Sequence, residues 1–257
     1  MNGVATSPDG IQIAYEAEGT GRPAIVFVHG WSCDRSYWRH QVGAFPGNRV
    51  VAIDLAGHGE SGFGRNSWTM PAFGADVAAV VDALGLDDAV LVGHSMGGDV
   101  ILEAAVLLEG RVRGLVWVDT YSSLGETDDT DDTNALVARL RIDFPCAARA
   151  FVREMFGPTT DPELVEWVAA DMSAAPPEIA IDAVRHALGN EAPAIDALSR
   201  LAVPVVAINP DHEPTDEASL LRHGVRPVIV TGLSHFLMLE DPGTFNRVLA
   251  EVVADFG

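Results

Sequence analysis

One stretch of the sequence carries residue types suited to nucleophilic chemistry. An apolar run rich in β-branched residues leads into Gly93-x-Ser95-x-Gly97, and a segment with helical character follows at 99–108. A serine on a sharp turn between a strand and a helix holds its hydroxyl clear of the sheet. Such a turn strains the serine backbone, so the residues two positions away must be small, and both are glycine. The pattern predicts Ser95 as a nucleophile, with the first helical amides directed at the reacting atom.

A serine hydroxyl needs a base to remove its proton, and His235 is the predicted base. It follows the apolar run 226–231, which is the last predicted strand. Because parallel strands bring their carboxyl ends to one edge of a sheet, we expect His235 at the same edge as Ser95. Of the eight histidines, His29 and His58 lie in glycine-flanked loops, where shaping of the backbone is the better interpretation.

The remaining chain shows alternating strand and helix patterns that must position these groups. Besides the run before the serine, strands are predicted at 11–17, 24–28, 49–54, 114–119, 202–208 and 226–231. Further helices are predicted at 70–84, 144–156, 162–172, 177–188 and 242–256. The alternation predicts an α/β fold, with a mostly parallel central sheet covered by helices on both faces. Since the strands stop between Asp119 and Val203, we expect a core domain (1–120 and 201–257) and a helical cap, or lid, insertion (121–200).

Four motifs, in this order, resemble those of the α/β-hydrolase superfamily. Residues 29–31 are similar to its His-Gly oxyanion loop, and 54–61 to its Asp-x-x-Gly-x-Gly-x-Ser stretch. Residues 93–98 are similar to its nucleophile elbow, and 234–242 to its catalytic histidine loop with the helix start behind it. The resemblance implies the α/β-hydrolase fold with a cap over the active site, in the capped serine esterase and lactonase-like branch.

The resemblance also implies an acidic residue that orients His235 and completes a catalytic triad. The family places this acid after the strand that follows the cap or, in some branches, after the strand before the cap. Three candidates result: Asp119 at the earlier strand end, and Asp211 and Glu213 in the later loop. We favour Asp119, because its spacing from the serine is that of the early-acid branches and Pro210 stands where the later loop of the family has glycine.

An oxyanion that forms on a carbonyl needs hydrogen-bond donors, and the resemblance implies the backbone amides of Trp31 and Met96. The Trp31 ring either walls the substrate pocket or packs in the core. Asp99, one helical turn beyond the serine, is interpreted as a favourable charge near a helix N-terminus, with a substrate contact as the alternative. No cluster has metal-ligand spacing and no phosphate-binding glycine loop is present, so we expect neither metal nor cofactor.

The composition limits the partners and the location of the protein. The chain has 257 residues, 48% of them hydrophobic, and a formal net charge of −21. Such an acidic chain repels nucleic acid and anionic membranes, so the expected partner is a small-molecule substrate, and a homodimer is left open. Two cysteines, Cys33 and Cys146, make no disulfide framework. With no secretory signal pattern and no apolar run of about 18 residues, we expect a cytoplasmic protein.

The predicted function is hydrolysis of a small, largely apolar carboxylic ester or lactone through an acyl-enzyme on Ser95. Relatives that dehalogenate or open epoxides use an aspartate nucleophile, which Ser95 argues against. Carbon–carbon bond hydrolases show a longer glycine-rich run where this chain reads Trp-Ser-Cys-Asp at 31–34, yet they stay an alternative, as do haloperoxidase-like relatives. The alternative from another class is a small-molecule receptor on the same fold with little turnover.

Overall fold

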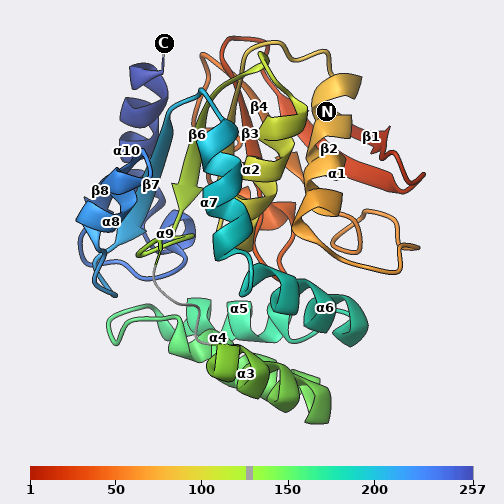
Figure 1. Ribbon diagram of the computed structural model, residues 1–257, viewed down its shortest axis with the longest axis vertical. Coiled ribbons are helices and arrows are strands. Elements are labelled where there is room, and N and C mark those ends of the chain that lie inside the picture. The colour runs from red at the N-terminus through yellow and green to blue at the C-terminus, as the bar shows by residue number, and fades with distance from the viewer. Residues whose placement is uncertain (126–129, 257) are drawn as a thin grey trace.

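The computed structural model describes residues 1–125 and 130–256, and an eight-stranded sheet forms its centre. The strands are β1 (Asn2–Thr6), β2 (Gln12–Glu18), β3 (Ala24–Val28), β4 (Arg49–Ile53), β5 (Ala89–His94), β6 (Val112–Val118), β7 (Val205–Pro210) and β8 (Val225–Val230). Their spatial order is β1-β2-β4-β3-β5-β6-β7-β8 (Figure 1). β2 pairs antiparallel with β1 and β4, and the strands from β4 to β8 run parallel. The predicted α/β fold with a mostly parallel sheet is confirmed.

Burial follows the position of each strand in the sheet. Every residue of β3, β5 and β7 is buried, because helices cover both faces of a parallel sheet and leave no polar face. β8 lies at the edge and keeps several side chains partly or fully exposed. β1 was not predicted from its short, mostly polar sequence; it forms by pairing with β2 at the opposite edge. The two strands that flank the elbow strand, β3 and β6, are therefore fixed in the centre of the core.

The helices divide into those that cover the sheet and those that lie beyond its edge. They are the 3-10 helix η1 (Arg35–Trp38), α1 (Met70–Ala83), α2 (Met96–Leu107), α3 (Thr130–Ile142), α4 (Phe144–Glu154), α5 (Pro162–Met172), α6 (Pro177–Ala187), α7 (Glu191–Arg200), α8 (Glu217–Arg222), α9 (Leu237–Glu240) and α10 (Pro242–Asp255). α1, α2 and α7 pack on one face (Figure 1). On the opposite face, the ring of Trp38 lies 4.7 Å from that of Phe27 and 6.2 Å from that of Phe245, which ties η1 and α10 to the sheet.

α3 to α6 pack on one another beyond the carboxyl ends of the strands, as Figure 1 shows. This layer occupies the place of the predicted cap, but it ends with α6 at Ala187. α7 (Glu191–Arg200) packs on α2 against the sheet, and the division into a core and a cap at residues 121–200 stays a prediction. The predicted insertion also includes 126–129, which lie outside the described residues. None of the helices in the described part of the chain is long and apolar enough to cross a bilayer.

Candidate active site

The predicted nucleophile stands at the sharp turn between β5 and α2. Ser95 has φ 51° and ψ −123°, a conformation that residues with a side chain rarely adopt. The helix begins at the next residue, three positions before the predicted start at Asp99. A β-carbon on Gly93 would lie 2.2 Å from the carbonyl oxygen of Gly97, and one on Gly97 would lie 2.6 Å from that of Val28. Neither position has space for a side chain, which confirms the reason predicted for both glycines.

His235 and Asp119 are in direct contact at the carboxyl edge of the sheet. Oδ2 of Asp119 lies 2.7 Å from Nδ1 of His235. Asp119 follows β6 with φ 47°, and its amide donates to the carbonyl oxygen of Ile208 on β7 at 3.0 Å. This anchored, left-handed residue turns its carboxylate toward the imidazole. Because the carboxylate accepts a hydrogen bond from Nδ1–H, the other ring nitrogen of neutral His235, Nε2, is left free to accept a proton.

The loop that carries His235 is held in place from two sides. The backbone amide of His235 donates to the carbonyl oxygen of Met155, at the end of α4, at 3.3 Å. The carbonyl oxygen of His235 lies 2.9 Å from Nε2 of His94. A carbonyl can only accept, so Nε2 of His94 is the donor, and burial lowers the pKa of His94, which keeps that ring neutral. Glu240 closes the loop by accepting from the amide and the hydroxyl of Ser234 at 3.1 and 2.7 Å. These contacts hold in place the backbone of the loop that carries His235.

The two other candidate acids lie elsewhere in the loop after β7. Asp211 is exposed, and its Oδ1 accepts from the amide of Gly232 at 2.7 Å, which joins the ends of β7 and β8. Glu213 is also exposed and lies at the wall of the cavity that contains His235. Of the three candidates, the structure brings only Asp119 within hydrogen-bonding distance of the imidazole.

Two further histidines act on the backbone of the loops around the site, as predicted. Nδ1 of His29 lies 2.8 Å from the carbonyl oxygen of Gly30, and its Nε2 accepts from the amide of Leu55 at 3.0 Å. Nδ1 of His58 lies 3.0 Å from the carbonyl oxygen of Ala56. Burial lowers the pKa of His29 to about 4 and that of His58 to about 3, so both rings are neutral at pH 7.

The predicted oxyanion donors, Trp31 and Met96, both line the cavity that Ser95 faces. Met96 is the first residue of α2, so its amide belongs to the helix N-terminal turn, where amides lack partners within the helix. The Trp31 side chain is buried, and its indole nitrogen donates to the carbonyl oxygen of Ala180 on α6 at 2.7 Å. Both interpretations of Trp31 therefore apply, since the ring walls the cavity and packs between the core and the layer of α3 to α6.

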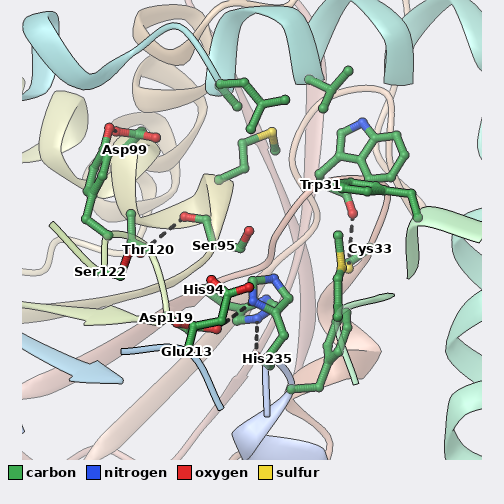
Figure 2. Close-up of a pocket in the computed structure, with 18 of the residues that line it drawn as sticks. Trp31, Cys33, His94, Ser95, Asp99, Asp119, Thr120, Ser122, Glu213 and His235 are labelled. Atoms are coloured by element: carbon green, nitrogen blue, oxygen red, sulfur yellow. Dashed lines mark hydrogen bonds and ion pairs between the residues drawn. The ribbon is translucent and has the colours of Figure 1, made fainter. Parts of the chain in front are cut away.

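The cavity has a volume of about 470 Å³ and two kinds of wall. Figure 2 shows Ser95, His235 and Asp119 on one side and Trp31 on the other. The apolar wall comes from Trp31 and from residues of α4, α5 and α6 and their ends, among them Phe151, Met155, Met172, Val184 and Leu188. The polar wall comes from α2 and the segment after β6, with Asp99, Thr120, Tyr121, Ser122 and Ser123. A small ligand would contact both walls at once.

Asp99 lies in the first turn of α2, as the sequence favoured, and it also lines the cavity. The residue is 96% buried, and its carboxylate accepts from the hydroxyl of Tyr121 at 2.7 Å and from Nδ2 of Asn190 at 2.8 Å. Burial raises its pKa to about 7. The sequence could predict a negative charge near the N-terminus of this helix. It could not predict the hydrogen bond from Asn190, which lies 91 positions away in the chain.

Comparison with known proteins identifies the family of this chain. A family model described as the Alpha/beta hydrolase family matches residues 25–248. The chain belongs to the α/β hydrolase family. Among solved structures, an esterase from Exiguobacterium antarcticum superimposes with a TM-score of 0.88 over 99% of this chain and 100% of its own, at 21% identity, a likeness of fold alone.

Curated relatives of this α/β hydrolase are esterase-, lactonase- and haloperoxidase-like enzymes. A non-heme haloperoxidase from Rhodococcus erythropolis is 45% identical over 95 residues, 36% of this chain. The match spans only 34% of that protein's length. The 3-oxoadipate enol-lactonase 2 of Acinetobacter baylyi is 28% identical over 244 residues, which cover 91% of this chain and 90% of its own. The family is therefore one of hydrolytic enzymes, and the reaction of this member has to be argued from its site.

Proposed function

We propose that this α/β hydrolase is a serine esterase that cleaves small carboxylic esters or lactones through an acyl-enzyme. The observation that carries the proposal is the 2.7 Å contact between Asp119 and Nδ1 of His235, in the cavity that also contains Ser95. An acid, an imidazole and a serine in this arrangement are the three parts that nucleophilic catalysis on a carbonyl needs.

The proposed reaction has two halves with the same base. Nε2 of His235 takes the proton of Ser95 as Oγ bonds to the carbonyl carbon, and Asp119 stabilises the imidazolium that results. The amides of Trp31 and Met96 donate to the negative oxygen of the tetrahedral intermediate. The imidazolium then protonates the leaving alcohol as the ester C–O bond breaks. In the second half, His235 takes a proton from a water molecule as the water oxygen bonds to the acyl carbon. His235 then gives this proton to Oγ of Ser95 as the bond between Oγ and the acyl carbon breaks, which releases the acid.

One contact of this mechanism has to form when substrate binds. Among the described residues, the Ser95 hydroxyl has no hydrogen-bond partner, and Figure 2 shows it directed into the space beside His235. Catalytic hydrogen bonds are often long in the absence of substrate and tighten in the complex. The apolar wall on α4 to α6 suits a short acyl or alkyl group, which supports a small, largely apolar substrate.

The proposal is tested by covalent labelling together with turnover. A fluorophosphonate should add its mass to the wild-type protein, with the adduct on Ser95, and Ser95→Ala should abolish labelling and lower hydrolysis of p-nitrophenyl acetate by roughly 10⁴-fold or more. Ser122→Ala is the matched control, because Ser122 lines the same cavity and should leave labelling intact. Labelling that persists in Ser95→Ala would contradict the mechanism, and a single slow turnover in the wild type would favour a receptor.

The cytoplasmic location expected from the sequence is part of the same proposal. Fractionation of cells that express the full chain, with detection of Ser95 labelling in each fraction, tests it. Labelled protein confined to the membrane or the medium would contradict it.

A further inference from the structure

A second carboxyl group faces the cavity with one oxygen unoccupied. Both donors that reach Asp99, the Tyr121 hydroxyl and Nδ2 of Asn190, bind its Oδ1. In the described part of the chain Oδ2 has no hydrogen-bond partner, although only 4% of the residue is exposed. Oδ2 itself is not fully buried, because it is open to the cavity that Asp99 lines. An unpartnered carboxylate oxygen in such a place can accept a hydrogen bond from a ligand. Here the two donors fix the orientation of the carboxyl and leave Oδ2 to the cavity.

The charges around the cavity decide which ligand group suits this oxygen. The described residues that line the cavity include four carboxyls, Asp99, Asp119, Glu191 and Glu213, but no lysine or arginine. The carboxyl side chains make the potential in the cavity negative, which favours hydrogen-bond donors and cations and repels carboxylates. Burial raises the pKa of Asp99 to about 7, which is the response of a carboxylate that lacks a cationic partner.

We propose that Asp99 determines substrate specificity, with Oδ2 accepting a hydrogen bond from a hydroxyl or a protonated amine of the substrate. The inference rests on the proposed esterase function and names its substrate class. Asp99 lies four residues after Ser95 on the first turn of α2, so the donor group sits one helical turn, roughly 6 Å, from the scissile carbonyl. The substrate is therefore a small ester with an apolar part for the wall of α4 to α6 and a donor group for Asp99.

Matched esters with equal chain lengths test this assignment. We would measure kcat/KM for alkyl acetates, ω-hydroxyalkyl acetates and ω-(dimethylamino)alkyl acetates of two to five carbons, with ω-carboxyalkyl acetates as the disfavoured set. The wild type should prefer one donor-bearing ester over the alkyl ester of equal length by about tenfold or more, as expected for one hydrogen bond to a charged group. The hydroxyl and amine arms identify which donor the site takes.

Variants assign the preference to one side chain. Asp99→Asn should remove this preference: kcat/KM on the donor-bearing ester should fall by about tenfold or more, and kcat/KM on the alkyl acetate of equal length should fall less, because the variant retains the oxygen that Tyr121 and Asn190 bind. Asp99→Glu, which extends the carboxylate by one methylene, should shift the preferred chain to a shorter ester. Glu103→Gln is the control, since Glu103 lies on the same helix but outside the cavity, and it should keep the preference. Thermal melting of each variant verifies folding.

The outcomes separate this inference from the function on which it rests. Equal kcat/KM for alkyl and donor-bearing esters in the wild type would overturn the role of Asp99 while ester hydrolysis and labelling of Ser95 still stood. A preference that survives in Asp99→Asn, or an equal loss on all esters, would also overturn it. If the wild type hydrolysed no ester and no fluorophosphonate labelled Ser95, the esterase proposal itself would fail.

Discussion

Asp99 and Asp119 line the same cavity, but their surroundings give the two carboxyls different chemistry. Asp119 contacts an imidazole, which can take up a positive charge, and its side chain is 22% exposed. Asp99 contacts a phenol and an amide, both neutral, and is almost completely buried. A carboxyl beside a group that becomes cationic stabilises the charge that arises during reaction, whereas one among neutral donors is itself poorly stabilised when ionised.

The comparison teaches that partners, and not residue type or location in the cavity, set the role of an acid. Asp119 ends a strand and reaches His235, 116 positions later in the chain. Asp99 lies in the first turn of α2 and takes its donors from Tyr121 and Asn190. Asp119 and His235 are expected to determine the rate of the reaction. Asp99 and its two donors are expected to determine the choice of substrate and the pH dependence of stability. Substitutions at each position can break this distinction.

The largest effect is expected for Asp119→Asn. An amide holds the ring of His235 but stabilises the wrong tautomer, in which Nε2 carries the proton and cannot accept one, so kcat on p-nitrophenyl acetate should fall by roughly 10⁴-fold. The rate of fluorophosphonate labelling at Ser95 should fall with it. Steady-state kinetics on the folded variant measures the loss, and a decrease of less than tenfold would show that another acid orients the imidazole.

The next effect is a change in stability with pH at Asp99. Its pKa is raised from 3.8 to about 7 in the folded protein, so folding takes up a proton between these pH values and the wild type loses stability as pH rises through this window. The integrated loss is on the order of 4 kcal/mol. Asp99→Asn cannot ionise, so its melting temperature relative to wild type should rise from pH 4 to pH 8. A difference that is constant with pH would contradict the account.

The sequence predicted the parts of this comparison that depend on local pattern. The helix starts predicted at Pro162 and Pro242 are confirmed. In the structure Asp161 and Asp241 accept amides of these helices, as an aspartate before a helix with proline at its start commonly does. The elbow was equally readable, since its two glycines have no space for a side chain. Such features involve residues a few positions apart, and the physical cause is in the pattern itself.

Features that depend on distant partners could not be read in the same way. Asp119 and Asp211 both follow parallel strands at one sheet edge, so the sequence favoured Asp119 but kept Asp211 and Glu213 as alternatives, and it gave no sign of the direct contact between Asp119 and His235. α7 has the periodicity of its neighbours 162–172 and 177–188, and only its packing on α2 separates it from the layer over the cavity. The donors to Asp99 were missed for this reason as well.

A smaller effect is expected for Tyr121→Phe, which removes one of the two donors to Oδ1 of Asp99. The variant should lose about 1 kcal/mol of stability at pH 8, where the carboxyl is ionised and needs the donor, and less at pH 4. The hydrogen bond from Tyr121 lowers the pKa of Asp99, so the pH window of Asp99 should also move upward. Chemical denaturation at both pH values measures these changes, and an equal loss at both would mean that the hydroxyl acts elsewhere.

The smallest effects are expected at the two acids that the structure leaves away from the imidazole. Asp211→Asn weakens a surface contact with Gly232. Glu213→Gln removes the charge of one exposed carboxyl at the wall of the cavity. For both variants, kcat/KM on p-nitrophenyl acetate should stay within about threefold of wild type. Glu213→Gln has the sharper consequence for the comparison. If Glu213→Gln lowered kcat/KM as much as Asp119→Asn, the acid that orients His235 during the reaction would be Glu213, after β7. The contact between Asp119 and His235 would then exist only in the absence of substrate.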